Sequence, residues 1–437
     1  MIRLAFAALA FLAAAPAQAE IDIREVTTPG GIDAWLVEDH SIPFVALELR
    51  FRGGAALDPA GKSGATNLMS GLLEEGAGDM DARAFARATE RLATSFEYET
   101  SDDAVSISAK FLTENRAESV RLLRESLVNP TFSEKALERV RGQVLSVIRS
   151  DKTEPRAIAG RAFDKLVFGD HPYARSRNGT TRSVTGLTRE DIVKAHRAAL
   201  ARDRVYVSAV GDIDAETLSA LLDRLLGDLP ETGAALPGPA DPNLPGGTKV
   251  VDFDTPQSVA MLAQPGIDRD DPDFFAAYIL NHILGGGSFE SRLMNEVREK
   301  RGLTYGVYSY LVDRDHAQLW MGSVSSSNDR IAEAIAVIRD QWRRMREDGV
   351  TAEELKDAKT YLTGAYPLRF DGNGPIANIL AAMQMEGLSP GYIDNRNDKV
   401  RAVTRKDVNR VARDLLAPEK LTFVVVGQPE GLKATIN

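Results

Sequence analysis

The chain has 437 residues, of which 43% are hydrophobic, and its formal net charge at pH 7 is −10. This length favours two domains of about 200 residues each, and the hydrophobic share is sufficient for two cores. The acidic balance argues against nucleic acid or an anionic membrane as a partner. The chain has no cysteine, so its stability cannot depend on disulfides.

The first 19 residues have the pattern of a cleaved secretory signal. Arg3 supplies the short positive region, an apolar run extends from Leu4 to Ala15, and the small-residue triplet A-Q-A follows at 17–19. The apolar run is too short to favour a membrane span. The sequence therefore predicts a signal peptide over 1–19, a mature chain that begins at Glu20, and a soluble periplasmic location.

The N-terminal half alternates groups of strands with groups of helices. Residues 21–50 alternate apolar and polar side chains, which predicts strands joined by hairpins. Residues 64–73 are apolar with a helical period, and residues 92–111 alternate again. Helices are expected over 114–127 and 133–150, since each begins after a polar residue.

An internal repeat divides the chain. Residues 184–211 match residues 400–427 without a gap, so that Thr188 corresponds to Thr404 at an offset of 216 residues. Each copy reads as a capped helix, a short loop and a buried strand. Two copies this far apart predict two halves of one fold that are related by duplication.

A proline-rich and glycine-rich segment separates the two halves. We predict a signal peptide over 1–19, an N-terminal domain over 20–228, a semi-rigid linker over 229–247 and a C-terminal domain over 248–437. Because strands and helices alternate in groups, the predicted fold class is α+β. Each domain is expected to be a mainly antiparallel sheet with helices packed on one face.

The stretch from Leu284 to Leu311 reads LGGGSFESRLMNEVREKRGLTYGVYSYL and predicts a helix that turns into a strand. Ser288 is the expected N-cap, and Gly302 stands where a left-handed residue would end the helix. The apolar residues expected on one face of this helix, at four-residue intervals, are Phe289, Leu293 and Val297. A strand is expected from Leu303 to Val312.

Arg298 and Tyr305 then come from two elements that meet at one tight corner. On spacing alone, Arg298 is a solvated partner of the helix dipole and Tyr305 is a packing residue of the strand. The GGGS run resembles a phosphate cradle only weakly, since neither a GxGxxG nor a Walker pattern surrounds it.

The same stretch resembles the C-terminal-half signature of the pitrilysin/insulinase family of zinc metallopeptidases, the inverzincins. The signature R-E-x-x-G-L-x-Y is represented here by Arg298, Glu299, Gly302, Leu303 and Tyr305. The resemblance implies that the Arg and the Tyr contact a peptide substrate. It extends over nearly the whole mature chain, and it implies that two α+β halves face each other around a chamber for an extended peptide.

The residues of the family's zinc site are missing. The family uses H-x-x-E-H on one helix and a Glu about 75 residues later as ligands and base. Asn67, Ser70 and Gly71 stand at the positions of the motif, and Val147 aligns with the distal Glu. Gly and Val offer no ligand atom, and a neutral Ser or Asn is a poor zinc ligand and no base. We therefore expect no metal and no cofactor in this chain.

Other chemistry has little support. The five histidines are never three to five residues apart, and they are His40, His171, His196, His282 and His316. A lone His on a helix is more often structural than a ligand. Without cysteine and without a G-x-S-x-G turn, a cysteine or serine hydrolase is disfavoured.

The leading hypothesis is a non-catalytic subunit of a periplasmic heterodimeric zinc peptidase. In the family, some members are pairs in which one subunit carries zinc and the other carries the Arg and the Tyr. Arg298 and Tyr305 would act in trans, and a homologous H-x-x-E-H subunit would supply zinc. The alternative is a pseudo-enzyme that scaffolds an assembly or binds peptides, for example at the strand edge of residues 95–100. A stand-alone hydrolase ranks third.

Overall fold

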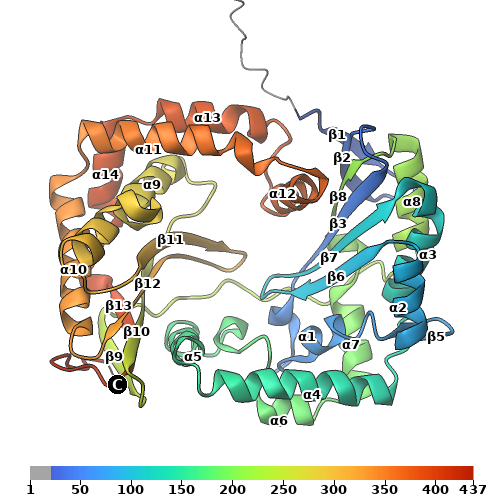
Figure 1. Ribbon diagram of the computed structural model, residues 1–437, viewed down its shortest axis with the longest axis horizontal. Coiled ribbons are helices and arrows are strands. Elements are labelled where there is room, and N and C mark those ends of the chain that lie inside the picture. The colour runs from blue at the N-terminus through green and yellow to red at the C-terminus, as the bar shows by residue number, and fades with distance from the viewer. Residues whose placement is uncertain (1–20, 437) are drawn as a thin grey trace, which may run out of the picture.

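The computed structural model describes residues 21–436, which form two halves with a sheet and a set of helices each (Figure 1). The predicted signal peptide and the predicted start at Glu20 lie outside the described residues. Within the described range, no helix combines the length and the hydrophobicity that a membrane span requires. The expected α+β class is confirmed.

The N-terminal sheet has six strands in the order β1-β2-β8-β3-β7-β6. Neighbouring strands pair antiparallel except for β2 and β8, which are parallel. The strands are β1 (Arg24–Thr27), β2 (Asp33–Glu38), β3 (Phe44–Arg52), β6 (Ser95–Thr100), β7 (Ala104–Leu112) and β8 (Val205–Gly211), and β4 (Gly76–Ala77) pairs with β5 (Met80–Asp81) in a separate ribbon. The prediction of a mainly antiparallel sheet is therefore confirmed for this half.

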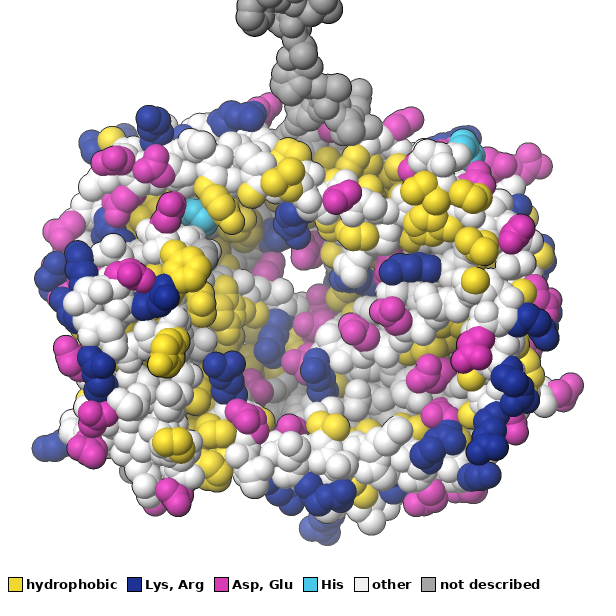
Figure 2. Space-filling view, viewed as in Figure 1, with side chains coloured by type: hydrophobic (Ala, Val, Ile, Leu, Met, Phe, Trp, Pro, Cys, Tyr) yellow, Lys and Arg dark blue, Asp and Glu magenta, His cyan; other side chains and the backbone are white. Residues whose placement is uncertain are grey.

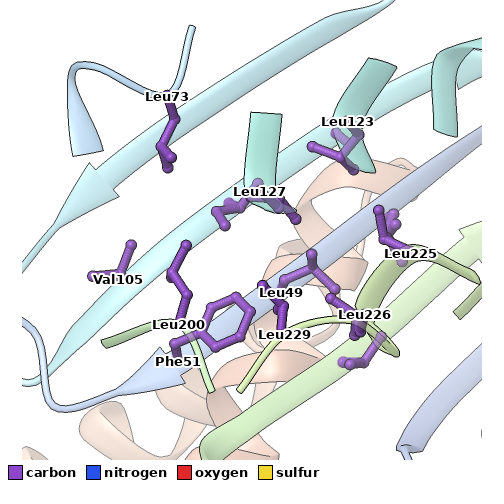
Figure 3. Packing of buried hydrophobic residues seen from close by; sticks show 14 of the residues in the cluster. Leu49, Phe51, Leu73, Val105, Leu123, Leu127, Leu200, Leu225, Leu226 and Leu229 are labelled. Carbon is purple, nitrogen blue, oxygen red and sulfur yellow. The ribbon is translucent and has the colours of Figure 1, made fainter. Parts of the chain in front are cut away.

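Most helices of the N-terminal half cover one face of this sheet. Leu49 and Phe51 of β3 point into the resulting core, where leucines of α3 and α8 meet them (Figure 3). Burying leucine and phenylalanine side chains is the main source of stability for such a layer. The helices are α1 (Ala65–Ser70), α2 (Ala82–Arg91), α3 (Arg116–Val128), α4 (Glu134–Asp151), α5 (Pro155–Phe168), α6 (Thr181–Thr185), α7 (Arg189–Ala199) and α8 (Ala215–Leu226).

The C-terminal sheet has five strands in the order β11-β12-β10-β13-β9, and only β13 and β9 pair in parallel. The strands are β9 (Gly247–Asp252), β10 (Gln257–Pro265), β11 (Val307–Arg314), β12 (Ala317–Ser327) and β13 (Thr422–Gly427). The α-helices are α9 (Phe274–Asn281), α10 (Ile331–Asp348), α11 (Ala352–Ala365), α12 (Asn373–Met385), α13 (Tyr392–Ala402) and α14 (Arg405–Leu415).

The two copies of the predicted repeat occupy the same place in the two halves. Helix α7 begins with a capping box of Thr188 and Asp191, and α14 begins with one of Thr404 and Asp407. Strand β8 lies between β2 and β3, and β13 lies between β9 and β10. This equivalence makes β6 and β11 corresponding edge strands of the two sheets.

Each half also contributes one helix to the other half's sheet. Helix α12 packs on β3 and β8, and α5 packs on β10 and β13. Ser208 Oγ of β8 donates to the Ala377 carbonyl of α12 at 2.5 Å, and Gln384 Nε2 donates to the Val207 carbonyl at 2.8 Å. The prediction of helices on one face is therefore incomplete, because the opposite face of each sheet carries a helix from the other half.

The connection between the halves has no helix or strand over residues 230–246. It is nevertheless held on both sides, since the Ala240 N–H donates to the His316 carbonyl and the Asn243 N–H donates to the Val167 carbonyl, both at 2.8 Å. A proline-rich segment held in this way fits the semi-rigid linker expected from its composition. The boundaries at 228/229 and 247/248 stay a prediction.

Candidate functional site

The helix that carries Arg298 is wider than an α-helix. Residues Met294–Glu299 form π-helical turns, and the Lys300 N–H donates to the Asn295 carbonyl, five residues earlier, at 2.9 Å. Leu293 and Val297 are fully buried, as the spacing predicts. Such π-turns are rare and often occur at functional sites.

The expected start of this helix is wrong. Ser288 belongs to the 3-10 turn Ser288–Glu290 and does not directly precede the helix, and another π-helical segment, His282–Gly286, comes before this turn. Because the chain departs from a regular α-helical path here, Phe289 does not share the buried face of Leu293. The Phe289 side chain is 61% exposed.

The expected end of the helix at Gly302 is confirmed. Gly302 has φ +59°, and its N–H donates to the Arg298 carbonyl at 2.7 Å. Arg330 donates to the carbonyls of Gly302 and Arg301, both at 2.8 Å. Sequence reasoning missed Arg330, because it is 28 residues from Gly302 and no local pattern connects them.

The Arg298 guanidinium lies over the Phe289 ring, with 4.7 Å between Cζ and the ring centroid. Its Nη1 also lies 2.9 Å from Glu299 Oε1. No other hydrogen bond or ion pair joins this guanidinium to a residue in the described range. Because a guanidinium has five N–H donors, most of them remain free for a ligand.

Tyr305 lies in the connection between the helix and β11, not in the strand itself, which begins at Val307. Its side chain is 89% exposed, and its hydroxyl bonds to no residue within 21–436. Thr304 fixes the adjoining backbone, since its hydroxyl donates to the Ser325 carbonyl at 2.6 Å and accepts from the Gly306 N–H at 3.0 Å. The interpretation of Tyr305 as a packing residue is therefore not supported.

The space between the two halves is hollowed at its centre (Figure 2). The edge strands β6 and β11 both border this space in the ribbon view (Figure 1). Tyr308 and Tyr310 alternate with buried residues along β11 and are 45% and 40% exposed. The corner with Arg298 and Tyr305 therefore adjoins an edge strand that presents further aromatic side chains.

The positions expected to have lost the zinc site lie on α1, at the residue directly after it, and on α4, which contacts α1. Asn67 Nδ2 donates to Asn178 Oδ1 at 3.2 Å, and the buried Ser70 hydroxyl has no hydrogen-bond partner in the described part of the chain. A Cβ added at Gly71 would lie 3.3 Å from Val140 Cγ1, so little room remains there for a larger side chain.

Val147, the last of the four positions of the lost zinc site, lies on α4 and is 48% exposed. It follows Val140 by seven residues, which places both on about the same helix face. The side chains at the four positions do not fit a zinc ion, because they offer at most a neutral amide and a hydroxyl. In residues 21–436, no cluster of three or more His, Cys, Asp or Glu is arranged to bind a metal. The absence of zinc from this chain stays a prediction.

Comparisons with known proteins agree with this arrangement. A crystal structure from Pseudomonas fluorescens, described as a peptidase M16 inactive domain, is 30% identical with a TM-score of 0.88 over 94% of this chain and 99% of that chain. The family model "Insulinase (Peptidase family M16)" matches residues 34–181, and "Peptidase M16 inactive domain" matches residues 186–362. The chain belongs to the insulinase family, peptidase family M16.

Two more distant relatives cover nearly the same length. The "Non-peptidase homolog YmxG" of Helicobacter pylori is 26% identical over 390 residues, which is 89% of this chain and 90% of that protein. A chain of complex III from Candida albicans has the same fold, with a TM-score of 0.76 and 15% identity over 94% of this chain and 97% of that chain. With the residues of the zinc motif replaced, this chain resembles the inactive-type and non-peptidase members of the insulinase family.

The histidines of this insulinase-family chain are bound in structural contacts. His196 Nε2 lies 2.7 Å from the Leu127 carbonyl, and burial lowers the pKa of this imidazole. His282 stacks on Tyr361 with 5.1 Å between ring centroids, and burial lowers its pKa too. His171 and His316 come from different halves and lie 5.8 Å apart, a proximity that their sequence positions could not predict.

A cleft of about 490 Å³ lies where the two halves meet, and its walls are strongly charged. Two ion pairs lie beside it, Arg52 with Asp315 at 3.4 Å and Arg269 with Glu386 at 3.0 Å. Burial is the main cause that raises the pKa of Asp315 to about 6, although Arg52 opposes the shift. This cleft does not contain Arg298 or Tyr305, so it is distinct from the corner described above.

Proposed function

We propose that this chain is the non-catalytic subunit of a periplasmic heterodimeric zinc metallopeptidase. Arg298 and Tyr305 would contact the peptide in the active site of a homologous partner that contains H-x-x-E-H. The periplasmic location rests on the signal-like pattern of residues 1–19.

The main observation behind the proposal is that Arg298 and Tyr305 both keep hydrogen-bond donors free. The phenol of Tyr305 is almost fully exposed, and Arg298 keeps most of its donors free. Meanwhile Arg330 and Thr304 hold the backbone that presents them. Rigid support for exposed donors is expected of a binding site, because a preorganised site loses little entropy when the ligand arrives.

The chemistry that these residues offer is hydrogen-bond donation to a peptide. The Tyr305 hydroxyl and the Arg298 N–H groups can donate to a backbone carbonyl and to the oxyanion into which it develops during hydrolysis. Donors directed at a developing oxyanion contribute about 3 kcal/mol each in well-studied peptidases. The zinc ion that activates water would be held by the partner.

Three comparisons support the subunit assignment. The family model that covers Arg298 and Tyr305 is described as an inactive domain, and the Helicobacter relative is named a non-peptidase homolog. The similar Candida chain is part of complex III, which is an assembly. An inactive homologue that retains two substrate-directed side chains is most useful beside an active one.

Co-purification tests the proposal. A tagged chain would be recovered from periplasm under mild salt, and the proposal expects a homologous chain with H-x-x-E-H in roughly equal amount. Such a specific complex buries at least about 1,000 Å². The recovered pair should cleave peptides in a chelator-sensitive manner, and recovery of only the tagged chain would refute the proposal.

The alternative function is a pseudo-peptidase that binds peptides or scaffolds an assembly without turnover. The edge strand β6 favours it, because β6 pairs only with β7 and its other edge has no strand partner in the described chain. An extended peptide can add to such an edge through backbone hydrogen bonds. Peptide binding by the isolated chain, without an H-x-x-E-H partner in the same compartment, would favour this alternative.

A further inference from the structure

Phe289 is an apolar side chain that the fold does not bury. It is 61% exposed, and it projects from the short 3-10 turn between two π-helical segments. Its ring contacts the Arg298 guanidinium in a cation–π interaction, with 4.7 Å between Cζ and the ring centroid. Since the exposed ring gains little from burial, hydrophobic packing alone does not explain its position.

The neighbouring arginines show how Arg298 differs. Arg292 is bound by Glu354 at 2.6 and 2.8 Å and by the Gly349 carbonyl at 2.7 Å. Arg301 is bound by the carbonyl and the carboxylate of Glu296, both at 2.7 Å. The contacts of Arg292 engage both Nε and Nη2, whereas those of Arg301 engage only Nη1, so Arg292 is the arginine held in a structural network through its N–H edge.

The Arg298 guanidinium is instead centred over the face of the Phe289 ring, with 4.7 Å between Cζ and the ring centroid. A ring face offers no oxygen acceptor, so this contact leaves the guanidinium N–H groups available to the oxygen acceptors of a ligand. Glu299 reaches only one of them, Nη1. An unrestrained arginine would lose side-chain entropy when a ligand orders it. A ring that restricts the guanidinium beforehand reduces this loss.

We propose that Phe289 is a positioning residue, which holds the Arg298 guanidinium against its ring and keeps the free N–H edges available to a peptide carbonyl. That the ligand is a peptide rests on the proposed function, whereas the positioning of Arg298 rests on the observed contact with Phe289. It predicts that Phe289 acts only through Arg298. The competing explanation is that Phe289 touches a peptide side chain directly.

The contact itself can be tested on the isolated full-length chain. In nitrogen-15 NMR with labelled arginine, the side-chain protons of Arg298 should show a ring-current shift that Phe289→Leu abolishes and Phe289→Tyr retains. The Arg292 signals serve as the internal control and should not move. Identical Arg298 shifts in the wild type and Phe289→Leu would overturn the proposal.

The consequence for binding can be tested on the co-purified pair with a quenched-fluorescent peptide that the wild-type pair cleaves. Phe289→Leu should raise KM about two- to fivefold, the effect of one exposed cation–π contact, with an unchanged melting temperature. Phe289→Tyr should restore the wild-type KM. Tyr361→Leu removes another exposed aromatic side chain and is the matched control.

A double-mutant cycle distinguishes positioning of Arg298 by Phe289 from direct contact between Phe289 and the peptide. In an Arg298→Ala background, Phe289→Leu should have no further effect on KM. An equal effect in both backgrounds would show that Phe289 contacts the peptide itself and would overturn the proposal. If Arg298→Ala changes neither KM nor kcat, the proposed function fails, and the NMR shifts still decide whether Phe289 positions the guanidinium.

Discussion

Arg314 Nη1 lies 3.2 Å from Asp102 Oδ2, and this ion pair joins the two halves of the molecule. Asp102 belongs to the turn after β6, and Arg314 ends β11, so the contact connects the two equivalent edge strands. The Arg314 guanidinium also lies over the Tyr173 ring, 5.0 Å from its centroid, and the Tyr173 hydroxyl donates to Asp103. The edge strands are therefore held together at one end and are free to border the hollow at the other.

The first prediction concerns this ion pair. A double-mutant cycle of Asp102→Asn and Arg314→Gln, measured by urea denaturation, should give a coupling of about 1 kcal/mol, because both side chains are largely buried. The exposed pair of Glu118 and Arg121 on α3 is the control, and its coupling should be about 0.3 kcal/mol. A coupling at Asp102 no larger than in the control would contradict a role in joining the halves.

The second prediction is that the free energy of unfolding depends on pH through Asp164 of α5, the helix that packs on the C-terminal sheet. Burial is the main cause that raises the pKa of Asp164 to about 6, with Asp102 adding to the shift and Arg314 opposing it. A carboxyl group whose folded-state pKa is raised stabilises the fold below its unfolded pKa, and that stability is lost as pH rises through the folded value. Asp164→Asn should therefore be more stable than wild type by about 1–2 kcal/mol at pH 8.

This stability difference should shrink as pH falls from 8 to 5, because the wild-type carboxyl becomes protonated in the folded state. Thermal unfolding at both pH values measures it. Asp170→Asn, at a fully exposed site two residues beyond the end of α5, provides the control substitution. A constant difference between Asp164→Asn and wild type across this range would contradict the assigned pKa.

The third prediction concerns the two donors in the reconstituted pair. Tyr305→Phe should lower kcat about 10- to 1,000-fold and leave the fold and the complex intact, because it removes one hydroxyl that bonds to nothing in the described chain. Arg298→Ala should also raise KM, because a charged donor helps to position the substrate before reaction. Steady-state kinetics with thermal unfolding in parallel would measure both, and wild-type turnover by well-folded variants would remove the catalytic role.

The fourth prediction concerns metal. With Asn67, Ser70, Gly71 and Val147 at the former ligand positions, the purified chain alone should contain no stoichiometric zinc and should cleave no peptide. Elemental analysis after dialysis against zinc, with a peptidase assay, checks this. One zinc per chain together with chelator-sensitive cleavage by the isolated chain would be the opposite result.

Much of this fold follows from local sequence patterns, and the rest depends on long-range contacts. Thr188 and Thr404 with their capping partners predict two equivalent helices, and Gly302 predicts the end of the Arg298 helix, because a cap is a local interaction. The placement of α5 and α12 on the opposite sheets could not be predicted, since both helices look like ordinary members of their own halves.

The candidate site also combines features that local sequence patterns predict with features that arise from long-range contacts. Arg298 and Tyr305 were identifiable from the motif, but the contact of Arg298 with Phe289 depends on a 3-10 turn where the spacing favours an α-helix. Arg330 was not identifiable, since its role arises only when β12 and the corner meet in space. The π-helical turns have no distinct spacing signal, because a single widened turn changes too few positions.

Because α5 and α12 each pack on the sheet of the other half, they also set the order in which the chain can finish folding. The N-terminal sheet is complete in sequence by Gly211, but α12, which covers Trp35, Ala46 and Val210 on its second face, begins only at Asn373. During synthesis at about 5–20 residues per second, this apolar face stays uncovered for some seconds. A fragment that ends at the linker would expose it permanently, and a large exposed apolar patch favours aggregation. The smallest unit that can fold to completion is therefore the two halves together.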